Sequence, residues 1–231
     1  MTSPAGRQIV DGPDSFSRHF NVSRETVDKL TIYVRLLEQW QRTINLVAPA
    51  TLASVWHRHI ADSAQLLSLA PHNATRWVDL GSGAGFPGLV LAILLSERPL
   101  SQVTLVESDT RKVAFLREVA RQVGLGQAQT SLGTAPSPVD IWHARIESPS
   151  THVRVGLVDV VTARALAPLP RLLGLCQPFF GPATVALLLK GREAERELAE
   201  ARSHWLLDAE LVPSLTEADA RIAVVSKLQL K

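Results

Sequence analysis

Cysteine is almost absent from this chain: Cys176 is the single one in 231 residues. A lone cysteine excludes an internal disulfide framework and a metal cluster held by cysteines. Its apolar neighbours predict a buried core thiol. Long apolar runs are missing as well, since the longest, residues 89–95 and 185–189, are far shorter than a membrane-spanning helix. No signal peptide is recognisable before the body of the chain, so we expect a cytoplasmic protein without membrane contact.

The chain also lacks a large excess of either charge. Lysine and arginine number 24 against 22 acidic residues, a formal net charge of +2 at pH 7. This weak positive balance permits a nucleic-acid partner without requiring one. With 46% hydrophobic and 20% charged residues, the chain can build one sizeable α/β core with an appended element. We expect an N-terminal arm and helical extension over residues 1–72 and one Rossmann-like domain over residues 73–231.

Glycines gather in the segment VDLGSGAGFPG, which has the pattern of a strand, a glycine turn and a helix start. Gly81, Gly83 and Gly85 free the backbone for positive φ and allow a ligand close to the main chain, although a plain tight turn would use them too. Pro87 suits the first helical position. The dinucleotide fingerprint requires glycine or alanine where Phe86 stands. The turn therefore favours a cofactor without phosphates, S-adenosylmethionine, over NAD or FAD.

An acidic residue ends the next predicted strand. Residues 103–107 form a short, mostly apolar run typical of a buried parallel strand. Glu107 at its end is placed to accept hydrogen bonds from both hydroxyls of an adenosine ribose. Alternatively, its charge favours the dipole of the following helix, which Ser108 or Asp109 would cap.

Hydrophobic periodicity predicts the remaining elements. Residues 1–22 lack a clear period and are expected to be a loose arm. Ser23 is a candidate N-cap for an amphipathic helix over residues 24–43, in which Tyr33 and Trp40 serve packing. A second helical piece is expected over residues 51–69, a loop over 133–138 and a solvent-facing charged helix over 192–203. Strands are expected to begin at Trp77 and to cover residues 103–107, 139–142, 158–162, 184–189, 206–212 and 221–228.

The alternation of these strands with helices predicts a mostly parallel sheet closed by an antiparallel pair. In such a sheet the ligand lies at the carboxyl ends of the strands, at the switch point beside the first strand.

Several short motifs occur together along the chain: Asn45-Leu46, Arg58-His59 with Asp62-Ser63, Gly81-Ser82-Gly83-Ala84-Gly85-Phe86-Pro87-Gly88, Ala144-Arg145-Ile146-Glu147, Thr162-Ala163-Arg164-Ala165 and Lys190-Gly191. From about residue 37 to residue 191, the chain resembles the bacterial 16S ribosomal RNA guanine-N7 methyltransferases of the RsmG (GidB) family. The glycine turn is shared by most methyltransferases of this fold, whereas the Gly-Phe-Pro-Gly and Ala-Arg-Ala motifs are specific to the family. Residues 1–20 and 128–138 have no recognised counterpart, and Glu107 stands where the family often has aspartate.

The resemblance implies a class I S-adenosylmethionine-dependent methyltransferase with a mostly parallel, seven-stranded Rossmann-like sheet and an N-terminal helical extension. Its implied activity is methylation of guanine N7 at one guanine in the 530 loop of 16S ribosomal RNA. The implied partner is that RNA or the assembling 30S subunit, and we expect a monomer without a metal.

Roles follow from the same resemblance. Cofactor contacts are expected from Asp79, Gly81, Ser82, Gly83, Gly85, Phe86, Glu107, Ser108, Asp109, Ile146, Glu147 and Arg164. Catalytic contributions are expected from Arg164, Lys190, His59 and Asp62, and RNA contacts from Arg58, Arg145, Lys190 and Arg192.

Simpler interpretations of some of these residues stay open. Arg164 could form a structural salt bridge to an acid at the end of the sheet. His59 and Asp62, three apart on a helix, could pair with each other instead of contacting substrate. The cluster His57-Arg58-His59 has too few further ligands at usable spacing for zinc.

Guanine N7 carries a lone pair and no proton, so its methylation requires no general base. Catalysis should come from holding N7 in line with the methyl group and from the electrostatics of the site. The sequence has no Asn/Asp-Pro-Pro-aromatic motif for an exocyclic amine after the fourth strand, and Cys176 is misplaced for attack on a pyrimidine. Two alternatives remain: a methyltransferase for another RNA, a small molecule or a protein, and a binding module of the same fold without activity.

Overall fold

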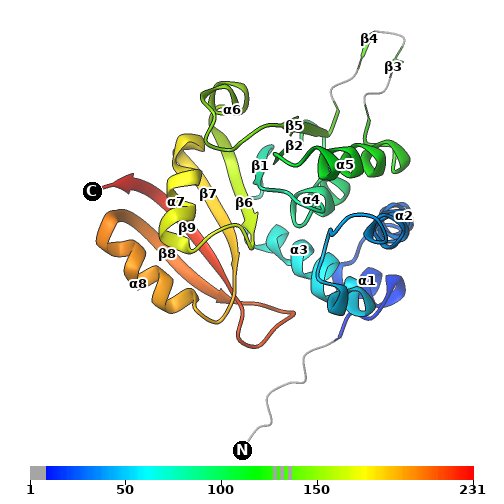
Figure 1. The fold of residues 1–231 in the computed structure, drawn as a ribbon, viewed down its shortest axis with the longest axis horizontal. Coiled ribbons are helices and arrows are strands. Elements are labelled where there is room, and N and C mark those ends of the chain that lie inside the picture. Colours follow the sequence, from blue (N-terminus) through cyan, green and yellow to red (C-terminus); the bar gives the residue numbers. More distant parts are fainter. Residues whose placement is uncertain (1–8, 127–128, 131–132, 135–136) are drawn as a thin grey trace, which may run out of the picture.

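The computed structural model describes residues 9–126, 129–130, 133–134 and 137–231. Its centre is a seven-stranded sheet in the order β5-β2-β1-β6-β7-β9-β8 (Figure 1). The strands are β1 (Arg76–Leu80), β2 (Gln102–Glu107), β5 (Val139–His143), β6 (Val158–Arg164), β7 (Phe180–Lys190), β8 (Trp205–Pro213) and β9 (Arg221–Leu230). The first five are parallel, and β9 pairs antiparallel with both β7 and β8. The predicted sheet, including its antiparallel closure, is confirmed.

Helices cover both faces of the sheet (Figure 1). One face carries α1 (Pro13–Phe20), α2 (Arg24–Gln41), α3 (Asp62–Ala64), α4 (Gly88–Leu95) and α5 (Thr110–Gln122). The other carries α6 (Pro149–Val155), α7 (Leu169–Cys176) and α8 (Ala194–His204). Each layer has its own apolar core, because successive strand residues point to opposite faces. In β1, Trp77 packs under the first group of helices, whereas Val78 and Leu80 pack under the second.

The N-terminal segment corrects the sequence prediction. We expected a loose arm over residues 1–22, but residues 13–20 form the helix α1 and residues 1–8 lie outside the described part. Ser15 Oγ accepts a hydrogen bond from the amide of Gly12, which fixes the helix start, and Phe16 is fully buried against Trp56. The fully buried ring stabilises this helix, and eight residues were too few to show a period.

The helix α2 matches its prediction, with the Ser23 side chain accepting from the amide of Thr26. The second helical piece is broken into a 3₁₀ segment, η1 (Pro49–Ser54), a π-helix, η2 (Trp56–Ala61), then α3 and a further 3₁₀ segment, η3 (Gln65–Ser68). π-Helical turns frequently occur at functional sites. Here the turn carries Arg58 and His59.

Other local predictions need small corrections. Pro87 is the N-cap residue of α4 and not its first helical residue, so the helix begins one position later than we expected. Asp109, and not Ser108, caps α5 by accepting from the amides of Arg111 and Lys112. The expected loop over residues 133–138 lies partly outside the described residues, while Gly133–Thr134 (β4) pairs with Gln129–Thr130 (β3). Cys176 is fully buried on α7, as predicted.

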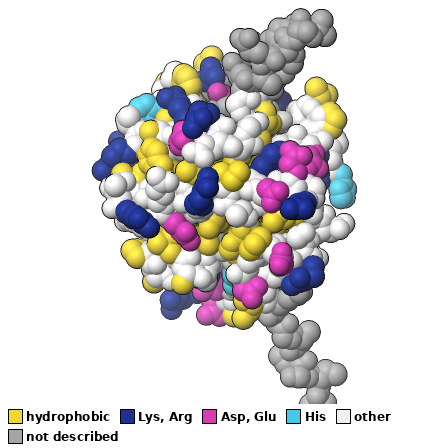
Figure 2. All heavy atoms as spheres, turned by 90° about the vertical axis from the view of Figure 1, so that its right-hand side faces the viewer, with side chains coloured by type: hydrophobic (Ala, Val, Ile, Leu, Met, Phe, Trp, Pro, Cys, Tyr) yellow, Lys and Arg dark blue, Asp and Glu magenta, His cyan; other side chains and the backbone are white. Residues whose placement is uncertain are grey.

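No helix in the described residues is both long and apolar enough to cross a membrane. On the face that carries α2 and α5, basic, acidic and apolar side chains are interspersed (Figure 2). Among the side chains drawn there, no broad patch of one sign stands out.

Candidate functional site

Two cavities meet at the carboxyl ends of the central strands. We call the first, of about 360 Å³, the turn cavity. It is lined by Gly81, Gly83, Val106, Glu107, Ser108, Lys112, Ala144, Arg145, Ile146, Glu147, Arg164, Ala165, Leu166, Ala167, Arg171 and Leu175. We call the second, of about 670 Å³, the outer cavity. Its wall includes Thr51, Arg58, His59, Asp62, Arg164, Ala165, Lys190, Arg192, Glu197, Thr216 and Glu217.

Arg164 and Ala165 line both cavities, so they mark the boundary between them. This boundary follows β6, directly beside β1, where the order of the strands reverses. It is the switch point that the sequence predicted for a ligand.

The glycine turn adopts the predicted left-handed conformations, with φ of 65° at Gly81, 56° at Gly83 and 93° at Gly85. The three glycines serve different purposes. A Cβ at Gly83 would meet only a backbone oxygen at 3.8 Å, so this residue leaves open space at the turn cavity. A Cβ at Gly85 would lie 2.6 Å from the Tyr33 hydroxyl. Gly85 therefore leaves room for the Tyr33 side chain of the N-terminal extension and not for a ligand.

Glu107 sits at the end of β2 with 8% of its surface exposed. One carboxylate oxygen accepts from the amides of Ser108 and Asp109, each at 2.7 Å, and the other accepts from Gly83 N at 2.8 Å. A carboxylate has about four acceptor positions, and three are used. Glu107 thus ties the glycine turn to the start of α5 and keeps about one acceptor position for a ligand hydroxyl.

Asp79 is fully buried beneath the turn. One oxygen accepts from Thr162 Oγ1 at 2.7 Å, and Oδ2 has no hydrogen-bond partner among the described residues. A Cβ at Gly88 would lie 2.6 Å from that oxygen, so the glycine lets α4 approach the carboxyl group closely. Burial raises the pKa of Asp79 to about 6. Asp79 therefore lies beneath the turn and does not line the turn cavity.

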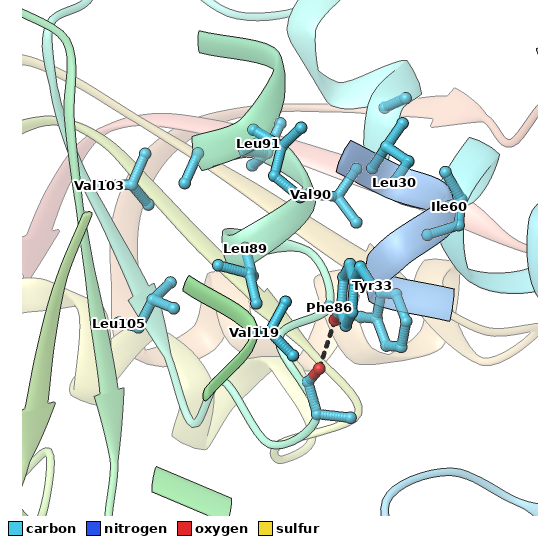
Figure 3. Packing of buried hydrophobic residues seen from close by; sticks show 14 of the residues in the cluster. Leu30, Tyr33, Ile60, Phe86, Leu89, Val90, Leu91, Val103, Leu105 and Val119 are labelled. Atoms are coloured by element: carbon cyan, nitrogen blue, oxygen red, sulfur yellow. Dashed lines mark hydrogen bonds between the residues drawn. The ribbon is translucent and has the colours of Figure 1, made fainter. Parts of the chain in front are cut away.

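Phe86 contacts two other rings. Tyr33 stacks on it with ring centroids 5.2 Å apart, and His59 stacks on it at 4.9 Å. Figure 3 shows Tyr33 and Phe86 packed together, with the hydrogen bond from the Tyr33 hydroxyl to the carbonyl of Ala84. The Arg164 guanidinium lies 5.0 Å from the centroid of the Phe86 ring. The N-terminal extension therefore supports both the glycine turn and Arg164.

Arg164 is held at three points. Its Nη1 donates to the carbonyl of Arg58 at 3.2 Å and lies 3.5 Å from Asp62 Oδ2, and its guanidinium rests over Phe86. The salt bridge that we considered does exist, but its partner is Asp62 of the helical extension and not an acid at the end of the sheet. Since the Arg164 side chain is 19% exposed, part of it remains open to both cavities.

His59 and Asp62 do not pair with each other. The π-helical turn directs His59 Nε2 to Thr51 Oγ1 at 2.7 Å, while Asp62 binds Arg164, Gln65 and Thr216. Burial and the nearby charges of Arg164 and Arg58 lower the pKa of His59 to about 3. His59 is therefore neutral at physiological pH.

The basic residues of the outer cavity have acidic neighbours. Lys190 Nζ lies 2.7 Å from Glu197 and donates to the carbonyl of Ala167 at 2.9 Å. Arg58 forms an ion pair with Glu217. Arg192 is exposed at the edge of the outer cavity, whereas Arg145 lines the turn cavity. The structure thus gathers three of the four candidate RNA contacts in the outer cavity.

The candidate cofactor residues divide into two sets. Seven line the turn cavity, namely Gly81, Gly83, Glu107, Ser108, Ile146, Glu147 and Arg164. Five others lie outside its lining: Asp79, Ser82, Gly85, Phe86 and Asp109. Two of these five have structural roles: Ser82 Oγ donates to the carbonyl of Asp79 in the turn, and Asp109 caps α5.

Three further residues at the site were not among the candidates from the sequence. Thr216 and Glu217 belong to the loop between β8 and β9, and the sequence showed there only a polar turn. Ala165 adopts φ of 52°, which is uncommon for a residue other than glycine and typical of functional sites. Ala165 lies directly after Arg164, so the chain turns sharply at the boundary between the two cavities.

The described residues include no group of three or more His, Cys, Asp and Glu side chains arranged to hold a metal ion. The turn cavity suits a small organic cofactor, because its volume falls in the range of ligand pockets. The open space at Gly83 and the spare acceptor on Glu107 fit an uncharged sugar edge.

Comparison with known proteins agrees with this geometry. The family model described as "rRNA small subunit methyltransferase G" matches residues 26–223. A relative from Parvibaculum lavamentivorans, called ribosomal RNA small subunit methyltransferase G, is 49% identical over 223 residues, covering 96% of this chain and 92% of its own. A relative of the same name from Methylorubrum extorquens is 50% identical over 210 residues, covering 90% and 92%.

Solved structures support the fold. A protein from Corynebacterium glutamicum matches with a TM-score of 0.55 at 14% identity, over 86% of this chain and 90% of its own. A mutant of MtNAS in complex with S-adenosylmethionine matches with a TM-score of 0.54 at 17% identity, over 96% and 86%.

Proposed function

Because this chain belongs to the rRNA small subunit methyltransferase G family, we propose that it methylates N7 of one guanine in the 530 loop of 16S ribosomal RNA. It is a methyltransferase with the class I fold, and S-adenosylmethionine is its methyl donor. The observation that carries the proposal is the pair of cavities that meet at Arg164, one suited to the cofactor and the other open to a base. The protein acts as a monomer in the cytoplasm, on the RNA or on the assembling 30S subunit.

The cofactor is held by the turn cavity. Gly81 and Gly83 receive its methionine part, and the spare acceptor position of Glu107 binds a ribose hydroxyl together with Ser108. Ile146 and Glu147, after β5, face the adenine. When bound, S-adenosylmethionine supplies a methyl group activated by a sulfonium centre. Arg164 and Ala165 would then lie between the bound cofactor and the outer cavity.

The guanine enters the outer cavity with its N7 edge toward Arg164. Arginine is the common partner of the guanine O6 and N7 edge, and a guanidinium beside O6 orients the ring without a proton transfer. Asp62 and the carbonyl of Arg58 hold Arg164 in place. Methylation at N7 leaves positive charge on the purine, which a neutral His59 and the nearby Asp62 carboxylate accommodate.

Arg58, Lys190 and Arg192 contact phosphates around the bound guanine. Arg145 is the exception, because it lines the turn cavity and lies closer to the cofactor. Single-stranded RNA loops are recognised by their shape, their exposed bases and their phosphates. Binding should accordingly weaken with salt.

The test combines two measurements. Purified protein is incubated with labelled S-adenosylmethionine and 30S subunits, stripped 16S RNA, or bulk protein and small molecules. Nucleoside mass spectrometry of 16S RNA from a deletion strain, with and without the restored gene, then locates the mark. We expect 7-methylguanosine at a single position of the 530 loop only when the gene is present. A mark on another atom, base or molecule would refute the substrate assignment, although the methyltransferase activity would stand.

A further inference from the structure

An acidic side chain forms an ion pair with Arg58, the arginine of the π-helical turn. Arg58 Nη1 contacts a carboxylate oxygen of Glu217 at the wall of the outer cavity, and the two side chains are 37% and 48% exposed. Glu217 belongs to the loop of residues 214–220, which joins β8 to β9 and lies 159 residues further along the chain. A carboxylate on the RNA side of the site is unexpected, because it repels the phosphates of an RNA substrate.

The loop does not depend on this ion pair for its position. Thr216 Oγ1 donates to Asp62 Oδ1 at 2.6 Å, and the amide of Leu215 donates to Gln65 Oε1 at 2.8 Å. His57 Nε2 lies 3.0 Å from the carbonyl of Thr216. These bonds pin the backbone directly before Glu217. The carboxylate is therefore presented to Arg58 by a fixed loop.

An ion pair with this exposure contributes little to folding, because water screens it and two long side chains are ordered to form it. It is correspondingly easy to exchange. A phosphate group offers a guanidinium the same kind of paired oxygen acceptors as a carboxylate. The Glu217 carboxylate stands where such a phosphate oxygen would bind Arg58.

We propose that Glu217 is a built-in phosphate mimic, which pairs with Arg58 in the RNA-free protein and is displaced by a phosphate of the RNA substrate. The inference rests on the proposed function, because it assumes an RNA on the outer cavity. The exchange occurs one residue before His59 and on the residue whose carbonyl holds Arg164 at 3.2 Å. The exchange of the Glu217 carboxylate for a phosphate therefore takes place beside the methyl-transfer point. The ion pair between Glu217 and Arg58 also lowers the affinity of the protein for polyanions that cannot displace the carboxylate.

The decisive variant is Glu217→Gln, which removes the charge and keeps the shape of the side chain. Binding to 30S subunits and to stripped 16S RNA is measured by filter retention across a range of salt concentrations. We expect about two- to fivefold tighter binding at low salt, since the pair no longer has to open. The plot of log affinity against log salt should also become steeper by at most roughly 0.7 to 0.9, because in the wild type the released Glu217 carboxylate offsets one charge that Arg58 neutralises on the RNA.

Two further variants separate contact from charge. Glu217→Asp retains the negative charge but shortens the side chain on the pinned loop, which should weaken its contact with Arg58 and so also tighten binding. Glu118→Gln on α5 is the control, because it removes a half-buried carboxylate that is paired with Arg121 away from both cavities. It should leave RNA affinity unchanged. Thermal unfolding and the affinity for S-adenosylmethionine should be the same in all three variants.

Several outcomes would overturn the inference. If Glu217→Gln bound RNA equally or more weakly, Glu217 would be a bystander or a direct RNA contact. If Glu217→Gln tightened binding but Glu217→Asp did not, the effect would be general charge repulsion and not release of Arg58. Failure of the proposed function is distinguishable, because the wild-type protein would then neither bind nor methylate the ribosomal RNA.

Discussion

The hydroxyl of Tyr33 donates a hydrogen bond to the carbonyl of Ala84, and the Tyr33 ring stacks on Phe86 at 5.2 Å. A residue in the middle of α2 is thereby bonded to the centre of the glycine turn. Burial raises the pKa of Tyr33 above its usual value, so the phenol stays protonated and remains a donor. The helical extension is a structural part of the cofactor site.

Tyr33→Phe should weaken the affinity for S-adenosylmethionine while the fold is retained. The substitution keeps the ring stack but leaves a buried carbonyl without its donor, which costs about 1 to 3 kcal/mol of unfolding free energy. Urea unfolding measures that loss, and calorimetry measures cofactor affinity. Unaltered cofactor affinity alongside a lower stability would show that the bond serves folding alone.

Gly83→Val should abolish cofactor binding with a modest loss of stability. A branched side chain at Gly83 fills open space at the turn cavity, and its left-handed backbone adds about 1 to 2 kcal/mol of strain. Gly124→Val is the matched control, because Gly124 has φ of 72°, a Cβ there would meet nothing within 4 Å, and it lines neither the turn cavity nor the outer cavity. Calorimetry should show tight binding by the control alone. Equal binding by both variants would place the cofactor elsewhere.

Glu107→Ala should weaken cofactor binding by about 1.5 to 3 kcal/mol, the range for hydrogen bonds to a charged group. It also leaves the amides of Gly83, Ser108 and Asp109 without their acceptor. Glu107→Gln retains one carbonyl oxygen, so its affinity should fall between those of the wild type and Glu107→Ala. If both variants bound the cofactor like the wild type, Glu107 would serve only the turn and the start of α5.

Arg164→Ala should lose turnover by about 100-fold or more, since it removes the group that orients the base at the boundary of the two cavities. Arg202→Ala is the control, because Arg202 lies exposed on α8. Single-turnover methylation of 30S subunits measures the effect. Comparable rates for the two variants would remove Arg164 from the mechanism.

Asp79→Asn should change how stability depends on pH. The folded protein holds the Asp79 proton up to a pKa of about 6, above the ordinary value of 3.8, so ionisation opposes folding as the pH rises through this window. The wild type should lose about 3 kcal/mol relative to the variant between about pH 4 and pH 6, with no further change above about pH 7. Urea unfolding at each pH checks this, and His59 is common to both proteins. A difference that stayed constant with pH would mean that Asp79 ionises normally.

The sequence predicted the sheet and the glycine turn because both depend on local rules. Apolar runs of the right length identify buried strands, and Gly81 and Gly83 were recognisable by the backbone freedom that they provide. The same reasoning assigned Gly85 to the ligand. Its actual neighbour, Tyr33, belongs to a helix far earlier in the chain, and no local pattern could reveal that contact.

The outer cavity was only partly predictable for the same reason. Arg58, His59 and Asp62 were identified as candidates, but their partners depended on the π-helical turn, which changes the angular spacing of side chains. A regular α-helix would have favoured a contact between His59 and Asp62. The acid at Glu217 and the hydroxyl of Thr216 reach the site only through the pairing of β8 with β9.

Asp62 accepts a hydrogen bond from Thr216 on one oxygen and pairs with Arg164 on the other, so a single carboxylate joins three segments that lie far apart in the chain. During synthesis on the ribosome, the cofactor turn and Arg164 emerge well before Thr216. The loop that carries Thr216 is formed only when β9 pairs with both β7 and β8. A nascent chain that ends before β9 would contain the residues of the cofactor site. Asp62, the partner of Arg164, would still lack its hydrogen bond from Thr216. The support of Arg164 by Asp62 is therefore complete only when the C-terminal strand is in place.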